Sequence, residues 1–272
     1  MQKKKLIVTP PGPFAESNTY LDYLTKLISD KQIEVQILKS VPLIIKNPNP
    51  VNILGAGISA PHTFIQEKLM NMHEDHLKDI TKYFSSQGVK VDFQIGHQSP
   101  QELLQKELDR KECLMWAVEI SSDYNLWNEL FGTRETELAK EINLPTLCIP
   151  SQVKFENPRT LLIVSKGNQK LDEFIPVDII NSFNLDVLLM IDAEDVNIDS
   201  LKREAAFLDL KKDLDIVKAG FIDGEDSLKL FVDSSNPSWI AYHNFDKPFI
   251  ERAFNMNTTN FILSAERPVL VL

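Results

Sequence analysis

The chain has 272 residues, of which 25% are charged and 43% are hydrophobic. These ordinary globular values exclude a collagen, a coiled coil or a disordered chain. Its 29 basic and 39 acidic residues give a net charge of −10, which argues against partners such as nucleic acids and anionic membranes, because both attract clustered Lys and Arg.

The amino terminus combines basic residues with a short apolar segment. Leu6, Ile7 and Val8 are soon followed by Pro10 and Pro11, so the segment is shorter than the roughly seven apolar residues of a secretory signal. No stretch approaches the roughly 20 apolar residues of a membrane span, and two cysteines are too few for a disulfide framework. We therefore expect a cytoplasmic protein that begins with a buried strand.

Short apolar segments alternate with helical patterns through the first half of the chain. Tyr20, Leu24 and Ile28 share one helix face, and residues 99–102 have capping-box spacing with proline at the first helical position. In chain order we predict strands at 5–9, 33–38, 89–95, 113–118 and 147–149, and helices at 14–30, 61–86, from 100, and at 133–142. This alternation favours a doubly wound, parallel α/β sheet.

The pattern restarts after a linker predicted at 151–158. We predict strands at 161–164, 185–191, 216–221, 239–242 and 269–272, and a short helix at 201–210. Trp116 lies 29 residues before Pro145, and Trp239 lies 29 residues before Pro268. The first strands are offset by 156 residues and the tryptophans by 123, so the second half lacks 33 residues in its middle. The sequence thus predicts tandem domains at 1–150 and 159–272.

The two halves resemble a tandem pair of universal stress protein domains over nearly the whole chain. The resemblance is carried by residues 6–8, 88–91, Gly96 before 100–104, Gly132-Thr133 and 145–150 in the first half, and by 161–164 and 268–272 in the second. It implies a five-stranded parallel sheet of order 3-2-1-4-5 in each half. It also implies that the halves pair through their last strands as an internal pseudo-dimer. A further homodimer of the whole chain stays open.

Many proteins of this family bind ATP through a Gly-x2-Gly-x9-Gly-Ser/Thr loop after the fourth strand. Glycines admit the phosphates, and the following helix N-terminus favours anions. Here Gly132 and Thr133 keep the final pair, whereas Glu119 and Ser122 occupy the first two glycine positions. A carboxylate at Glu119 would repel phosphate. These four remain the candidate nucleotide-binding residues.

The second half departs further from the family's loop. Its corresponding positions are Tyr242, Phe245, Asn255 and Met256. The acidic residue that the family tends to place after the first strand is missing at 9–12 and at 165–167. The resemblance therefore implies that the second half does not bind ATP in the standard way, and we expect no resident cofactor, with ATP at the first domain as the alternative.

Other candidate sites have simpler interpretations. His73 and His76 have the spacing of a metal pair but lack a clear third ligand, so a partly buried structural role is favoured and no metal site is assigned. Cys113 and Cys148 fall on neighbouring predicted strands, where reduced, packed thiols are favoured over a disulfide. Trp127 and Phe131 fall in the predicted nucleotide loop, where their side chains either fill the space that a nucleotide would occupy or bind a partner.

No nucleophile motif stands out, and no catalytic residue is assigned. We expect a non-catalytic, cytoplasmic stress-response protein that binds a protein partner or a small ligand. The alternative is an ATP-binding, weakly hydrolysing switch in the first domain. A third option is an enzyme with its site near Pro10, Gly12 and Glu119, at the carboxyl ends of the first and fourth strands.

Overall fold

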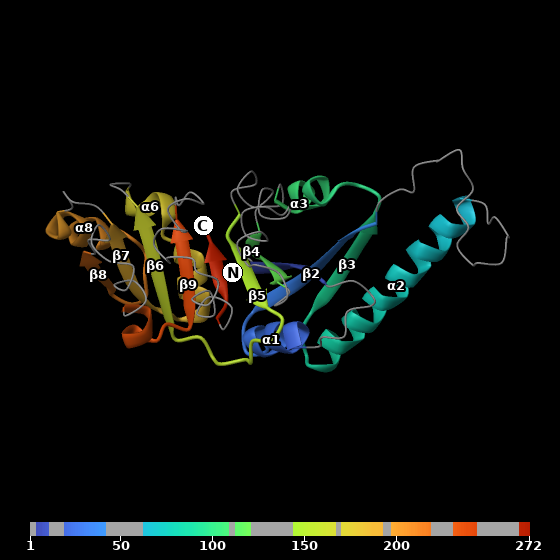
Figure 1. The fold of residues 1–272 in the computed structure, drawn as a ribbon, viewed down its shortest axis with the longest axis horizontal. Coiled ribbons are helices and arrows are strands. Elements are labelled where there is room, and N and C mark those ends of the chain that lie inside the picture. The colour runs from blue at the N-terminus through green and yellow to red at the C-terminus, as the bar shows by residue number, and fades with distance from the viewer. Residues whose placement is uncertain are drawn as a thin grey trace, which may run out of the picture. The chain divides into compact units, whose positions relative to one another are not determined.

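The structure is a computed structural model that describes residues 4–10, 19–41, 62–108, 112–120, 144–166, 170–192, 197–218, 231–243 and 267–272. Strands and helices alternate along these segments, so the predicted α/β class is confirmed (Figure 1). The chain divides into two compact units. One comprises Met1–Glu16 and Gln32–Cys113, and the other comprises Ser17–Lys31 and Leu114–Leu272.

The first unit contains a parallel sheet of order β3-β2-β1. Its strands are β1 (Lys4–Thr9), β2 (Ile33–Ser40) and β3 (Val91–Gly96). Helix α2 (His62–Ser86) packs against β3, and α3 (Pro100–Leu108) packs against β2. The predicted capping box begins α3: the Glu102 N–H donates to Ser99 Oγ at 3.2 Å, and the Ser99 N–H donates to Glu102 Oε2 at 2.9 Å.

The second unit contains the sheet order β4-β5-β10-β9-β6-β7-β8. Its strands are β4 (Cys113–Ile120), β5 (Thr146–Pro150), β6 (Thr160–Lys166), β7 (Asp186–Asp192), β8 (Leu214–Lys218), β9 (Trp239–His243) and β10 (Val269–Val271). Its helices include α1 (Thr19–Ile28), α6 (Leu171–Phe174), α7 (Val177–Phe183) and α8 (Ile198–Ala205). The order β8-β7-β6-β9-β10 is the predicted 3-2-1-4-5 arrangement for the second half of the chain.

Strands β5 and β10 run antiparallel to each other. Strand β4 is parallel to its neighbour β5, and β9 is parallel to its neighbour β10. Val269 lies opposite Cys148, and Leu270 lies opposite Leu147. All four side chains are buried. The last strand before the predicted linker therefore pairs with the last strand of the chain.

Helix α1 is anchored by two buried tyrosines. The Tyr20 hydroxyl donates to the Ala117 carbonyl on β4 at 2.8 Å, and the Trp239 indole N–H on β9 donates to the Tyr23 hydroxyl at 2.8 Å. The Phe155 ring packs edge-on against Tyr23 at 5.3 Å between centroids. Burial raises the pKa of both tyrosines, so both hydroxyls stay protonated.

Several boundaries differ from the sequence prediction. Helices α6 and α7 were not predicted, because they are short and Pro176 lies between them. Helix α8 begins and ends earlier than predicted, and β8 is shifted likewise. The predicted helix at 133–142 and residues 14–18 of the first predicted helix lie outside the described residues.

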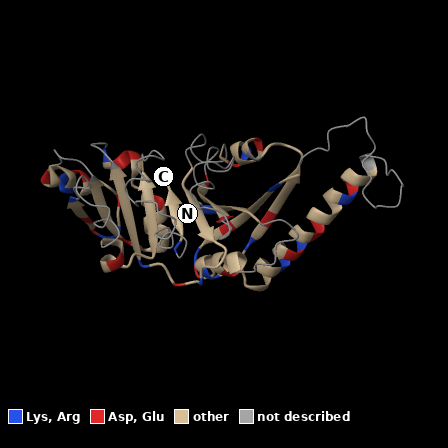
Figure 2. Ribbon diagram, viewed as in Figure 1, with Lys and Arg blue, Asp and Glu red and all other residues tan. Residues whose placement is uncertain are grey.

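Charge is distributed unevenly over the elements. Figure 2 shows acidic and basic residues interspersed along α2, where Lys78 pairs with Glu74 and Asp75 at 3.0 and 3.3 Å. Such exposed pairs contribute little to stability.

Within the described segments, no helix is long and apolar enough to cross a membrane.

Candidate functional site

The carboxyl end of β4 carries Glu119, the described member of the predicted nucleotide-binding set. Its backbone lies opposite Ile149 of β5, and its side chain is half-buried. The pKa of Tyr20 is raised first by burial and then by the charges of Glu119 and Cys148, so these three groups lie near one another. The structure thus places a carboxylate beside a buried, protonated phenol at this strand end.

The other predicted nucleotide-binding residues, Ser122, Gly132 and Thr133, lie outside the described residues. Trp127 and Phe131 also lie there. Their roles therefore stay predictions, and the argument at this end of the sheet rests on Glu119.

A second polar group occupies the carboxyl ends of β6 and β9. Ser165 and His243 are opposite each other in the strand register, and Ser165 Oγ lies 3.2 Å from His243 Nδ1. The imidazole stacks on the Phe174 ring of α6, with centroids 4.5 Å apart and planes inclined by 12°. In the order β8-β7-β6-β9-β10 the parallel strands β6 and β9 are neighbours, and successive strands are added to the sheet on opposite sides of this pair. Such a reversal of strand order is the topological switch point where α/β sheets bind ligands.

Burial decides what this pair can do. It lowers the pKa of His243, so the ring is neutral near pH 7. Ser165 is only 1% exposed, so its hydroxyl cannot meet a substrate and does not qualify as a nucleophile. Ser165 and Phe174 instead orient the imidazole. Tyr242, which the predicted offset of 123 residues aligned with the family's first loop glycine, is buried and directly precedes His243 in sequence.

Sequence reasoning missed the Ser165–His243 pair because the two residues are 78 positions apart. Only the pairing of β6 with β9 brings them together. Each of the two apolar strands ends with a polar residue, and this was the signal available in the sequence. A doubly wound strand order makes these two strands neighbours, so the two polar residues could have been expected to meet.

The two cysteines are not opposite each other. Strands β4 and β5 are neighbours as predicted, but Val118 lies opposite Cys148, and Cys113 begins β4 at the other end. Neither of these two cysteines forms a disulfide. The Cys113 Sγ lies 3.4 Å from the Glu107 carbonyl oxygen.

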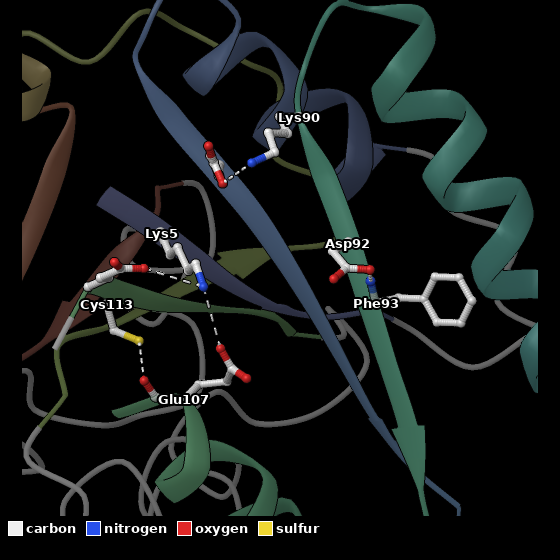
Figure 3. Close-up of polar contacts among 8 residues, drawn as sticks. Lys5, Lys90, Asp92, Phe93, Glu107 and Cys113 are labelled. Atoms are coloured by element: carbon white, nitrogen blue, oxygen red, sulfur yellow. Dashed lines mark hydrogen bonds and ion pairs between the residues drawn. The ribbon is translucent and has the colours of Figure 1, made fainter. Parts of the chain in front are cut away.

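Two ion pairs that share Lys5 lie near the start of β1 (Figure 3). The Lys5 ammonium is 3.8 Å from Glu107 and 3.5 Å from Glu112, and Glu107 is 1% exposed. Since ligands bind at the carboxyl ends of parallel strands, this cluster at the amino end of β1 is structural.

His73 and His76 lie half-buried on α2. The pKa of His73 is lowered by burial, then by the positive charges of Lys39 and His76. Within the described part of the chain, no group of three or more His, Cys, Asp or Glu side chains has the arrangement of a metal site.

Solved structures resemble this fold over its whole length. A universal stress protein from Archaeoglobus fulgidus DSM 4304 superimposes with a TM-score of 0.59 at 13% identity, covering 99% of this chain and 96% of that one. A functionally unknown protein from Pseudomonas aeruginosa PAO1 gives a TM-score of 0.52 at 13% identity, covering 99% and 92%. No family model matches the sequence, and no curated protein does. The chain therefore has a universal-stress-protein-like fold, as predicted.

Proposed function

We propose that the chain is a cytoplasmic stress-response protein of two universal-stress-like domains, 1–150 and 159–272, joined by a linker at 151–158. It binds a protein partner or a small ligand, catalyses no reaction, and has lost the standard mode of ATP binding. The antiparallel pairing of β5 with β10 supports an internal pseudo-dimer, because it joins the last strands of the two proposed domains.

The observation that carries the proposal is the half-buried carboxylate of Glu119 at the carboxyl end of β4. In ATP-binding relatives of this fold a glycine is expected there. Two unit charges about 5 Å apart at an effective dielectric constant of about 20 repel by about 3 kcal/mol. A penalty of that size weakens binding by about two orders of magnitude in Kd.

In the second domain, side chains already occupy the corresponding strand ends. Ser165, His243 and Phe174 pack together where β6 and β9 end. A phosphate cradle needs backbone N–H groups that can approach the ligand, which glycine permits and bulky side chains hinder. This packing supports the loss of standard ATP binding in the second domain as well.

Equilibrium dialysis with labelled ATP tests the proposal on the full chain. We expect no saturable binding at micromolar ATP for the natural sequence, and a gain in affinity for the Glu119→Gly/Ser122→Gly double variant. Glu119→Gln isolates the charge, and Asp79→Asn on the exposed face of α2 makes the same change of charge elsewhere. Micromolar binding by the natural sequence that Gly132→Trp abolishes would refute the proposal and favour an ATP switch in the first domain.

A further inference from the structure

Strand β3 ends the sheet in the first unit. Its one neighbour among the described strands is β2, so its other side is an open edge. The Val41 N–H, just beyond β2, donates to the Gly96 carbonyl of β3 at 2.9 Å. Since consecutive residues of a strand direct their backbone N–H and C=O groups to opposite sides, the even-numbered residues of β3 face β2. The residues whose backbone groups face the open edge are Val91, Phe93 and Ile95.

One carboxylate covers the middle of this edge. The outward N–H of Phe93 donates to Asp92 Oδ1 at 2.8 Å (Figure 3), and the Asp92 side chain is exposed. Charged side chains on edge strands are a common means of preventing another strand from pairing there. Asp92 therefore acts on the edge in two ways: its oxygen takes the central backbone donor, and its charge meets any strand that approaches.

Apolar side chains border the same edge. The odd-numbered side chains of β3 share one face of the sheet and are only half-buried, and Figure 3 shows the Phe93 ring extending toward α2. Helix α2 packs against β3, and its Gln66 amide lies 3.4 Å from the His97 ring just beyond the strand. The apolar side chains in this amino-terminal half of α2 are also only half-buried: Ile65, Leu69 and Met72. Apolar surface is thus left for a partner beside the open edge.

We propose that the open edge of β3 is a self-association surface, on which β3 of a second copy pairs antiparallel about a twofold axis at Phe93, and that Asp92 restrains this pairing. The partner is a second copy because the strand is complementary to itself in this register. Phe93 meets Phe93, and Val91 meets Ile95, so apolar side chains meet on one face. All three outward residues then form hydrogen-bonded pairs across the axis. On the other face Asp92 meets Gln94 of the second copy, so like charges are not directly opposite.

Asp92 opposes this dimer through its hydrogen bond and through its charge. The Phe93 N–H can bond to the second copy only after it leaves the Asp92 oxygen. In the paired register the two Asp92 side chains are diagonal neighbours across the axis, about 7–8 Å apart, so their charges repel. Replacing Asp92 by alanine removes both effects, whereas replacing it by asparagine removes the repulsion and keeps an oxygen that accepts from the Phe93 N–H.

Sedimentation velocity of the full chain over a range of concentrations tests the surface. We expect Asp92→Ala to strengthen dimerisation at least about tenfold relative to the natural chain, and Asp92→Asn to have a smaller effect of the same sign. Asp215 is an exposed acid on β8, the strand at the other end of the order, so Asp215→Ala is the matched control and should change nothing. Equal dimerisation of Asp92→Ala and Asp215→Ala would overturn the proposal.

A proline at the axis separates strand pairing from other modes of association. The Phe93 N–H faces away from β2, so adding Phe93→Pro to Asp92→Ala removes a donor to the second copy and no bond to β2. We expect this double variant to be monomeric, and Asp92→Ala/Phe93→Ala, which keeps the N–H, to dimerise more than it does.

Hydrogen exchange of the Asp92→Ala chain locates the contact. On dimerisation the amides of residues 91, 93 and 95 should become protected, whereas those of residues 92 and 94, which face β2, should be protected throughout. A dimer that persists with proline at position 93, or that leaves these three amides unprotected, would overturn the proposal. The surface involves none of residues 119–133, so these results and ATP dialysis test the two proposals separately.

Discussion

The crossover helices α2 and α8 connect the second and third strands of the first and second halves of the chain, and they differ greatly. Helix α2 has 25 residues and buries Leu77, Ile80 and Phe84 near its carboxyl end. Helix α8 has 8 residues and buries none. A short helix is therefore enough to connect the edge strand β8 to its neighbour β7. The extra amino-terminal turns of α2 carry the half-buried His73 and His76, so the added length contributes less to the core than the carboxyl end does.

The largest effect should come from the buried end of α2. Phe84→Ala removes a fully buried ring and should lower the free energy of unfolding by about 3–5 kcal/mol, because a cavity remains. Urea denaturation measures it. Phe64→Ala on the same helix, where the ring is 47% exposed, is the control and should cost far less. Equal costs would contradict the difference in burial between the carboxyl end and the amino end of α2.

Helix α8 should depend on a polar contact instead of on burial. The Glu204 carboxylate accepts from the Leu171 N–H at the start of α6 at 2.7 Å. Glu204→Ala should therefore cost about 1.5–3 kcal/mol, the usual loss for a hydrogen bond to a charged group. Glu173 is an exposed acidic residue on α6, so Glu173→Ala is the matched control. Thermal or urea unfolding of both variants gives the two free-energy losses to be compared. A loss as large as that of Phe84→Ala would mean that α8 is packed more deeply than its exposure indicates.

Acid should destabilise the protein partly through His243 and His73. Burial lowers the folded-state pKa of both rings, so the unfolded chain binds more protons near the ordinary pKa of about 6.5. The stability contributed by the neutral rings is complete above that pH and is lost as pH falls from it through the lowered pKa of each folded ring. His243→Asn and His73→Gln should each flatten the dependence of the urea midpoint on pH between about 7.5 and 5.5. An unchanged slope in both variants would contradict the assignment.

The smallest effect should follow a change just beyond α8. Phe207 is 90% exposed, so Phe207→Ser should change the free energy of unfolding by less than about 0.5 kcal/mol. Calorimetric melting of the variant and the natural chain provides the comparison. A clear loss of stability would show that this ring is covered in solution.

Much of the fold could be predicted because its strands are continuous apolar segments and its longest helix has a regular stripe. Residues 161–164 and Leu77, Ile80 and Phe84 are of this kind, and all are buried. The short helices α6 and α7 could not be predicted, because four and seven residues around Pro176 give no periodic signal.

The candidate sites were less accessible to sequence reasoning than the fold. Glu119 was identified because a counted glycine spacing points to it. Ser165 and His243 meet only through strand order, 78 residues apart. The sequence favoured a partly buried structural role for His73 and His76, and both side chains are half-buried on α2.

Native mass spectrometry of the purified full chain, before and after addition of ATP, tests the central claim most directly. The account predicts that the chain carries no ATP or ADP from the cell and retains none after brief desalting. The Glu119→Gly/Ser122→Gly variant should retain more than the natural chain does. One retained nucleotide per natural chain, lost in Gly132→Trp, would contradict the account.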